Sequence, residues 1–171
     1  MSPAIYLIDT SGLFRILQNP LREAWQDEMA AGVIALCPVV EIEFLFSARS
    51  LADRLEKQRL LRTVFGWQPM AERAFERAEA VQQLLTETGK HRSAGPVDLL
   101  IAATAEQASL TVLSDDRDFG VIAEVTGQRV RMVTDFHPGT PAVRHLGAHP
   151  APDPETADDD LGEFGGSPET A

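Results

Sequence analysis

Short apolar runs alternate with longer amphipathic segments along most of the chain. Residues 4–9, 33–37 and 111–114 are rich in aliphatic and β-branched side chains and carry no charge until they end, as buried strands do. A run at 129–133 includes two arginines and suits an edge strand. Because strands and helices that alternate in sequence build βαβ units, the pattern predicts an α/β sandwich with a mainly parallel sheet.

The segments between these runs have the apolar spacing of helices. Ser11 or Thr10 is the expected N-cap of the first helix. Leu51, Leu55 and Phe75 fall on apolar stripes and are expected to face the core. The expected helices cover residues 11–18, 20–32, 39–48, 51–65, 71–88, 97–108 and 118–126.

The composition is that of an ordinary soluble domain. The chain is 44% hydrophobic and 24% charged, and no apolar run approaches the ~20 residues of a membrane span. The first residues lack the basic region of a secretory signal, so we expect a cytoplasmic protein. Cys37 is the single cysteine, which excludes an internal disulfide and a multi-cysteine zinc site, and we expect it to be a buried core thiol.

The net charge of −11 is unevenly distributed along the sequence. Seven of the 26 acidic residues fall after Pro150, where no Lys or Arg occurs. From about residue 138 the chain is rich in Pro, Gly, Ala and acids, and it holds too few large apolar side chains to offset the entropy cost of ordering. We therefore expect a folded domain over 1–137 and a flexible acidic tail over 138–171.

Four carboxylates stand where strands or helices are expected to begin or end, and a fifth is expected to reach the same place from within a helix. Asp9 ends the first strand, and Asp116 and Asp118 follow the strand at 111–114. Asp98 opens a helix, and Glu43 lies within another. Because ligands bind outside the carboxyl ends of parallel strands, these side chains are expected to meet at one edge of the sheet. Carboxylates that meet repel one another unless Mg²⁺ or Mn²⁺ lies between them, and such a site suits phosphodiester hydrolysis.

Each of these carboxylates also has a structural explanation. Asp9 could be a helix N-cap, and Asp98 could be a first-turn acid favoured by the helix dipole. Asp116 and Asp118 could satisfy backbone amides of a turn, and Glu43 could be solvated. Their joint occurrence in this order is what favours a shared site.

The same segments resemble the PIN domain family, and within it the VapC ribonuclease toxins. The resemblance covers about residues 4–136 and is specific only when its four motifs are taken together. Asp9-Thr10-Ser11 is similar to the opening acidic motif, Glu43-Phe44-Leu45 to the helix glutamate, Asp98-Leu99-Leu100-Ile101-Ala102-Ala103 to the third acid, and Ser114-Asp115-Asp116-Arg117-Asp118-Phe119 to the closing Ser/Thr-x-Asp-x-Asp-Phe motif.

The resemblance implies a three-layer α/β/α sandwich with a mainly parallel sheet of four to five strands, and a metal-dependent endoribonuclease within residues 1–137. It implies that Ser11 and Ser114 orient the metal ligands. Asp115 is an additional acid at a variable position, so the resemblance leaves open which of the three neighbouring acids bind metal directly. The implied catalytic residues are Asp9, Glu43, Asp98 and Asp116, and the implied ligands of Mg²⁺ or Mn²⁺ are Asp9, Asp98, Asp116 and Asp118.

The resemblance also implies an RNA substrate, a homodimer and a small VapB-type antitoxin. RNA contact needs cations near the carboxylates, and surface solubility explains the available cations equally well. Arg15, Arg92 and Arg117 are the candidate RNA contacts, with Arg49 and Lys90 as further candidates at the rim.

Other functions stay open at this point. A housekeeping RNA-processing nuclease of the PIN type would carry the same acids, and a non-catalytic PIN-fold module would keep the fold without binding metal. A phosphotransferase of the haloacid dehalogenase type also has an aspartate after its first strand. That class places a second acid two residues later, where this chain has Ser11.

Overall fold

Five short parallel strands form one sheet in a computed structural model of the chain, which describes residues 3–135. The order across the sheet is β3-β2-β1-β4-β5, and each neighbouring pair is parallel. The predicted mainly parallel sheet of four to five strands is therefore confirmed. The strands are β1 (Tyr6–Ile8), β2 (Ile34–Leu36), β3 (Gly66–Trp67), β4 (Thr111–Ser114) and β5 (Val130–Met132).

Strand β1 is the centre of the sheet and pairs with both β2 and β4. Tyr6 is in register with Ile34 on one side and with Thr111 on the other. Leu7 and Ile8 have no exposed surface, because both faces of this strand are covered. Since the three strands are parallel and aligned, the residues that follow them lie at the same edge of the sheet.

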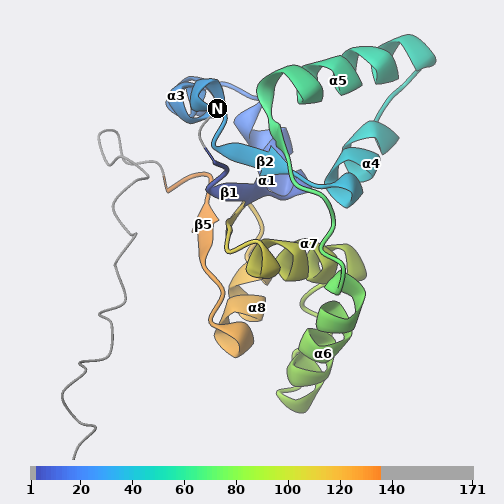
Figure 1. Ribbon diagram of the computed structural model, residues 1–171, viewed down its shortest axis with the longest axis vertical. Coiled ribbons are helices and arrows are strands. Elements are labelled where there is room, and N and C mark those ends of the chain that lie inside the picture. The colour runs from blue at the N-terminus through green and yellow to red at the C-terminus, as the bar shows by residue number, and fades with distance from the viewer. Residues whose placement is uncertain (1–2, 136–171) are drawn as a thin grey trace, which may run out of the picture. The chain divides into compact units, whose positions relative to one another are not determined.

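Helices cover both faces of the sheet, which gives the predicted three-layer α/β/α arrangement. Figure 1 shows α3 and α5 on one side of the strands and α6, α7 and α8 on the other. Helix α7 packs on β1 and β4. The helices are α1 (Thr10–Ile16), α2 (Leu21–Ala24), α3 (Gln26–Ala31), α4 (Pro38–Phe46), α5 (Leu51–Val64), α6 (Ala74–Glu87), α7 (Pro96–Gln107) and α8 (Asp118–Thr126).

The single helix expected over 20–32 is wrong, since the structure divides it into α2 and α3 at Trp25. The Trp25 backbone leaves helical geometry, with φ −102° and ψ 9°. Its side chain is fully buried, and its indole N–H donates to the carbonyl of Val133 at 2.9 Å. The break lets the indole reach this partner, because a buried Trp N–H requires an acceptor.

Three side chains expected in the core are exposed. Leu51, Leu55 and Phe75 are 72%, 49% and 71% exposed, whereas Leu61 is the buried residue of α5. Helical spacing identifies which residues share a face, but the packing of neighbouring elements decides how much of that face is covered. The prediction for Cys37 is confirmed, because its thiol is buried and free.

Strand β3 was not predicted, because two residues that include a glycine carry no strand pattern. In the part of the chain that the structure describes, no helix combines the length and apolar character that crossing a membrane requires. The tail expected over 138–171 lies outside the described residues.

Candidate active site

Asp9 directly follows β1 and caps α1. Its Oδ1 accepts the N–H of Gly12 at 2.8 Å, and its Oδ2 accepts the hydroxyl of Ser11 at 2.8 Å. The N-cap expected at Ser11 or Thr10 is therefore wrong, whereas the alternative that Asp9 caps the helix is confirmed, since Asp9 is the last extended residue and the helix begins one residue later. Asp9 is 4% exposed, and burial raises the pKa of its carboxyl, although the hydrogen bonds it accepts partly offset this.

Gly12 allows α1 to lie against the end of β4. A Cβ at this position would be 2.8 Å from the carbonyl oxygen of Leu113 and 2.9 Å from Oδ1 of Asp9. Both distances are far shorter than a real carbon contact, so a side chain here would push α1 away. Gly12 belongs to none of the motifs recognised in the sequence, and its only local signal is a glycine inside a helix, where it costs about 0.5–1 kcal/mol relative to alanine.

Two serines connect the loop after β1 to the loop after β4. Ser114, the last residue of β4, is fully buried, and its Oγ accepts the N–H of Asp116 at 2.8 Å. The hydroxyls of Ser11 and Ser114 are 3.2 Å apart, and Ser11 Oγ also accepts the N–H of Asp115 at 3.0 Å. The carboxylate of Asp9 is thus linked through two hydroxyls to the backbone that carries Asp116.

Asp98 lies in the first turn of α7, where its Oδ2 accepts the N–H of Gly95 at 2.8 Å. The pKa of its carboxyl is raised, chiefly by burial and further by repulsion from Asp116, Asp118 and Glu43. The pKa of Asp118 is raised as well, by burial and then by Asp116. Carboxylates from α4, α7 and the β4–α8 loop therefore lie within electrostatic reach of one another.

Glu43 extends from α4 toward the start of α1. Its Oε2 accepts the hydroxyl of Thr10 at 2.5 Å, although the glutamate is otherwise exposed. Thr10 was expected only as a possible N-cap, and its pairing with Glu43 could not be foreseen because the two residues are 33 positions apart. Glu41 lies two positions before Glu43 on α4, so the two side chains point to different sides of the helix. Glu41 accepts a hydrogen bond from Gln58.

The candidate RNA contacts differ in their surroundings. Arg15 forms an ion pair with Asp115, with 3.0 Å between Nε and Oδ2. Arg92 is exposed in the loop before α7, and Arg117 is exposed at the N-cap of α8. Lys90 forms an ion pair with Glu124.

The donors at this edge are carboxylate and hydroxyl oxygens, which suit a hard divalent cation. Within residues 3–135, no three Asp, Glu, His or Cys side chains stand close enough together to enclose a metal ion as they are. Asp9 and Asp98 are both engaged by backbone amides. Burial, and then repulsion from Asp116, Asp118 and Glu43, raises the pKa of Asp98. The donor chemistry fits a cation whose positive charge would offset that repulsion.

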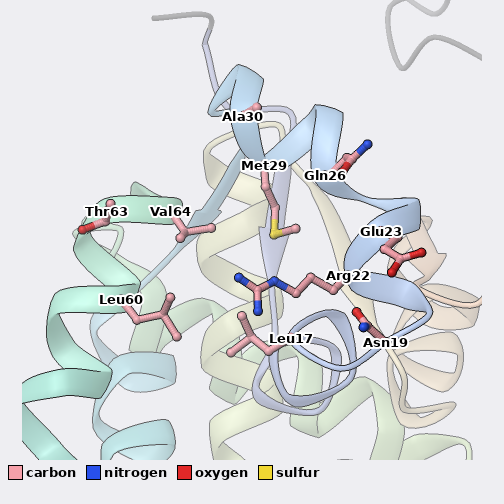
Figure 2. A pocket seen from close by; sticks show the side chains of 10 residues that line it. All are labelled: Leu17, Asn19, Arg22, Glu23, Gln26, Met29, Ala30, Leu60, Thr63 and Val64. Carbon is pink, nitrogen blue, oxygen red and sulfur yellow. The ribbon is translucent and has the colours of Figure 1, made fainter.

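A separate groove of about 590 Å³ lies between α2, α3 and α5. Figure 2 shows the side chain of Arg22 reaching from α2 into this groove toward Leu60 and Val64. None of the candidate carboxylates lines it. This groove is therefore not the candidate active site, in spite of its size.

Comparison with known proteins identifies what this arrangement is similar to. The PIN domain family matches residues 6–125. Ribonuclease VapC2 of Mycobacterium tuberculosis (strain CDC 1551 / Oshkosh) is 37% identical over 140 residues, which cover 81% of this chain and 99% of the relative. Ribonuclease VapC21 of the same strain is 35% identical over 135 residues, covering 79% and 96%.

Solved structures share the fold at lower sequence identity. The DNA-bound VapBC structure from Salmonella typhimurium has a TM-score of 0.62 at 20% identity and covers 76% of this chain and 98% of its own. FitAcB from Neisseria gonorrhoeae has a TM-score of 0.61 at 22% identity, covering 76% and 99%. VapBC-5 from Mycobacterium tuberculosis has a TM-score of 0.51 at 23% identity, covering 76% and 98%.

Proposed function

The chain belongs to the PIN domain family, and from this premise we propose that it is a metal-dependent endoribonuclease, the toxin of a VapBC-type toxin–antitoxin pair. The similarity to proteins named Ribonuclease VapC extends over nearly their whole lengths. The structural observation that supports the proposal best is the hydrogen-bonded chain that runs from the carboxylate of Asp9 through Ser11 and Ser114 to the backbone of Asp116, at the edge of the sheet where β1 and β4 end.

Asp9, Asp98 and Asp116 are the proposed ligands of Mg²⁺ or Mn²⁺, with Asp118 as a further ligand and Glu43 as a catalytic carboxylate that contacts the ion directly or through water. A bound divalent cation supplies an activated water and stabilises the charge that develops on the phosphate during hydrolysis. Burial and then repulsion from the neighbouring carboxylates raise the pKa of Asp98, and a bound cation would offset both costs of its negative charge.

The neighbouring residues hold these carboxylates in place. Ser11 donates to Asp9, and Ser114 fixes the backbone of Asp116. Thr10 donates to Glu43 and so restrains an otherwise exposed side chain. Such outer contacts fix the orientation of metal ligands and raise the affinity of the site.

The proposed substrate is RNA, and the exposed guanidinium groups of Arg92 and Arg117 are the proposed contacts to its phosphates. Each is near a proposed ligand in the chain: Arg92 lies in the loop that leads to Asp98, and Arg117 separates Asp116 from Asp118. An RNA substrate agrees with action in the cytoplasm.

A VapB-type antitoxin is the proposed partner, together with a second copy of the chain in a homodimer. Solved relatives of this fold are described as VapBC complexes. In this chain, Ile42, Phe46 and Leu51 are 70%, 92% and 72% exposed, and they lie on α4 and at the start of α5. Large exposed apolar side chains that gather in one region are typical of protein interfaces.

The direct test uses purified protein and a panel of structured RNAs with Mg²⁺, with Mn²⁺ and with EDTA. We expect cleavage only with a divalent ion. Asp98→Asn is the informative variant, because an asparagine oxygen still accepts the Gly95 N–H while the charge is lost. We expect it to fold and to lose at least 100-fold in kcat/KM. Asp27→Asn, which neutralises an exposed acid of α3, is the matched control and should cleave at the wild-type rate.

Full cleavage by a folded Asp98→Asn protein would overturn the assignment of the site. Calorimetric titration of the wild type with Mg²⁺ and Mn²⁺ separates a nuclease from a non-catalytic module, since a module would bind neither ion at millimolar concentration. Growth arrest on expression, relieved by a small protein encoded next to the gene, would separate a toxin from a housekeeping nuclease.

A further inference from the structure

The hydrogen bond between Thr10 and Glu43 lies at one border of the candidate active site. A small pocket begins one helical turn from this hydrogen bond. Phe14 follows Thr10 by four positions on α1, and Ser47 follows Glu43 by four positions at the end of α4. Residues four apart lie on the same face of a helix, about 5–6 Å apart at Cβ. Phe14 and Ser47 both line a pocket of about 380 Å³, so this pocket directly adjoins the acidic site.

The pocket exposes one aromatic ring, whose other side packs on a buried ring. Phe14 is 38% exposed, while its other side rests on Phe44, which is 4% exposed, with ring centroids 4.9 Å apart. The Phe44 ring is in turn approached by the Lys57 ammonium at 5.9 Å from its centroid. A ring that is supported on one side and open on the other can stack with a planar ligand without further rearrangement.

The rest of the pocket wall is cationic. Arg49, Lys57 and Asp53 line it, so two positive groups stand beside one negative group. Lys57 donates to Oδ2 of Asp53 at 3.3 Å and to the hydroxyl of Ser47 at 3.1 Å, which fixes its ammonium at the pocket wall. The wall therefore keeps a net positive charge next to an exposed aromatic face. This is the combination that single-stranded nucleic acid requires, since bases stack on aromatic rings while phosphates contact cations.

We propose that this pocket, lined by Phe14, Ser47, Arg49, Asp53 and Lys57, binds the nucleobase next to the cleaved phosphodiester, with Phe14 stacking on the base. The inference rests on the proposed ribonuclease function and adds to it a substrate-binding residue outside the acidic site. A nucleotide seated here would place its base on α1 one turn beyond Thr10 while its phosphate reaches the carboxylates. The charge of the wall favours RNA over an apolar protein segment, which would leave Arg49 and Lys57 desolvated.

The test compares Phe14→Leu, which keeps the apolar packing on Phe44 but removes the aromatic face, with Phe14→Tyr, which keeps the ring. We expect Phe14→Leu to lower kcat/KM by about 5- to 150-fold, mainly through KM, as the loss of one base stack does. Phe14→Tyr should restore cleavage to near the wild-type rate. Phe75→Leu removes an exposed ring from α6 and is the matched control, which should change nothing.

Substrates that carry a single abasic nucleotide give a second, independent arm. The abasic site is moved along the RNA one position at a time. At one position, the wild type should lose as much activity on the abasic RNA as Phe14→Leu loses on the intact RNA. On the RNA that is abasic at that position, the wild type and Phe14→Leu should cleave at equal rates. Fluorescence of a 2-aminopurine base at the same position, read with the Asp98→Asn protein so that no cleavage occurs, should be quenched on binding by stacking on Phe14.

The possible failures can be told apart. Equal cleavage by wild type and Phe14→Leu on all substrates overturns the subsite while leaving the nuclease assignment intact. Quenching without any cleavage by the wild type supports the subsite and counts against the nuclease. If Phe14→Leu leaves RNA cleavage unchanged but weakens the homodimer in sedimentation, the pocket is a protein contact and the inference is wrong.

Discussion

The Nε of Arg15 lies 3.0 Å from Oδ2 of Asp115, so the ion pair directs this carboxylate toward α1. Asp115 is the additional acid whose role the sequence left open. The repulsion acting on Asp98 comes from Asp116, Asp118 and Glu43. The ion pair therefore favours Asp116 over Asp115 as the carboxylate that serves the proposed metal site.

We predict that Asp116→Asn and Asp115→Asn differ sharply in activity. Asparagine at 116 can still accept the Asp118 N–H, so the fold should survive while kcat/KM falls by at least 100-fold. Asp115→Asn should cost less than about 10-fold, because its carboxylate pairs with Arg15. The Arg15 side chain is 49% exposed, so a double-mutant cycle by urea unfolding should give only about 0.2–1 kcal/mol for the pair. Equal losses from the two variants would contradict this division.

Removing the Thr10 hydroxyl should weaken metal binding through Glu43. Thr10→Val keeps the shape but cannot donate to Oε2 of Glu43, whereas Thr10→Ser can. Because outer contacts of this kind are worth about 10- to 100-fold in metal affinity or activity, Thr10→Val should raise the Mn²⁺ concentration for half-maximal cleavage about 10-fold. Thr10→Ser should match the wild type. An unchanged Mn²⁺ dependence in Thr10→Val would show that Glu43 needs no such restraint.

Gly12→Ala should destabilise the fold and the site together. The added methyl would meet the carbonyl of Leu113, which is backbone and cannot turn aside. Overpacking of this kind costs about 1–3 kcal/mol, and the shift of α1 would also disturb the hydrogen bond to Asp9. Urea unfolding measures the first effect and cleavage the second. Gly120→Ala, at a helical glycine with open space around it, is the control and should lose neither.

In the metal-free protein, acid should relieve the destabilising contribution of the site carboxylates. The pKa values of Asp9, Asp98 and Asp118 are raised above the ordinary 3.8, so these groups keep protons in the folded state after the unfolded chain has lost them. Stability from these groups is thus present at low pH and is lost as pH rises through the folded pKa values. In EDTA, Asp98→Asn should have a higher Tm than the wild type at pH 7, with a smaller difference near pH 4.

Added Mg²⁺ should reverse that order, because a bound cation stabilises the folded wild type and depends on the carboxylate that Asp98→Asn lacks. Thermal unfolding with and without Mg²⁺ checks this. A wild type that is more stable than Asp98→Asn in EDTA at pH 7 would show that the charge at this position is satisfied without metal.

The architecture could be predicted because it depends on local patterns. The apolar runs at 4–9 and 111–114 contain β1 and β4, and their lack of charge follows from burial on both faces. Strand β3 escaped prediction because Gly66–Trp67 carries no periodic signal. The break at Trp25 was missed because it depends on a hydrogen bond to Val133, 108 positions away.

The exposure of individual side chains was predicted less well than the order of the elements, because it also depends on contacts between residues far apart in the sequence. Leu51 and Phe75 lie on apolar stripes, yet packing covers neither of them. The apolar stripe of a helix can be read from the sequence, whereas the burial of that stripe depends on which other elements pack against it. Phe14 illustrates the functional consequence, since only its position over Phe44 and beside Lys57 suggests a role in binding.

Residue type and spacing along the chain are enough to predict the alternating α/β order, the acids at the ends of strands and helices, and the resemblance to a nuclease family. The ion pair of Asp115 with Arg15, the hydrogen bond from Thr10 to Glu43 and the need for a glycine at position 12 are visible only in the folded protein. Two of these contacts join residues that are far apart in the sequence, and the third brings the backbone of α1 against the end of β4. Such proximity exists only after the parallel strands have aligned.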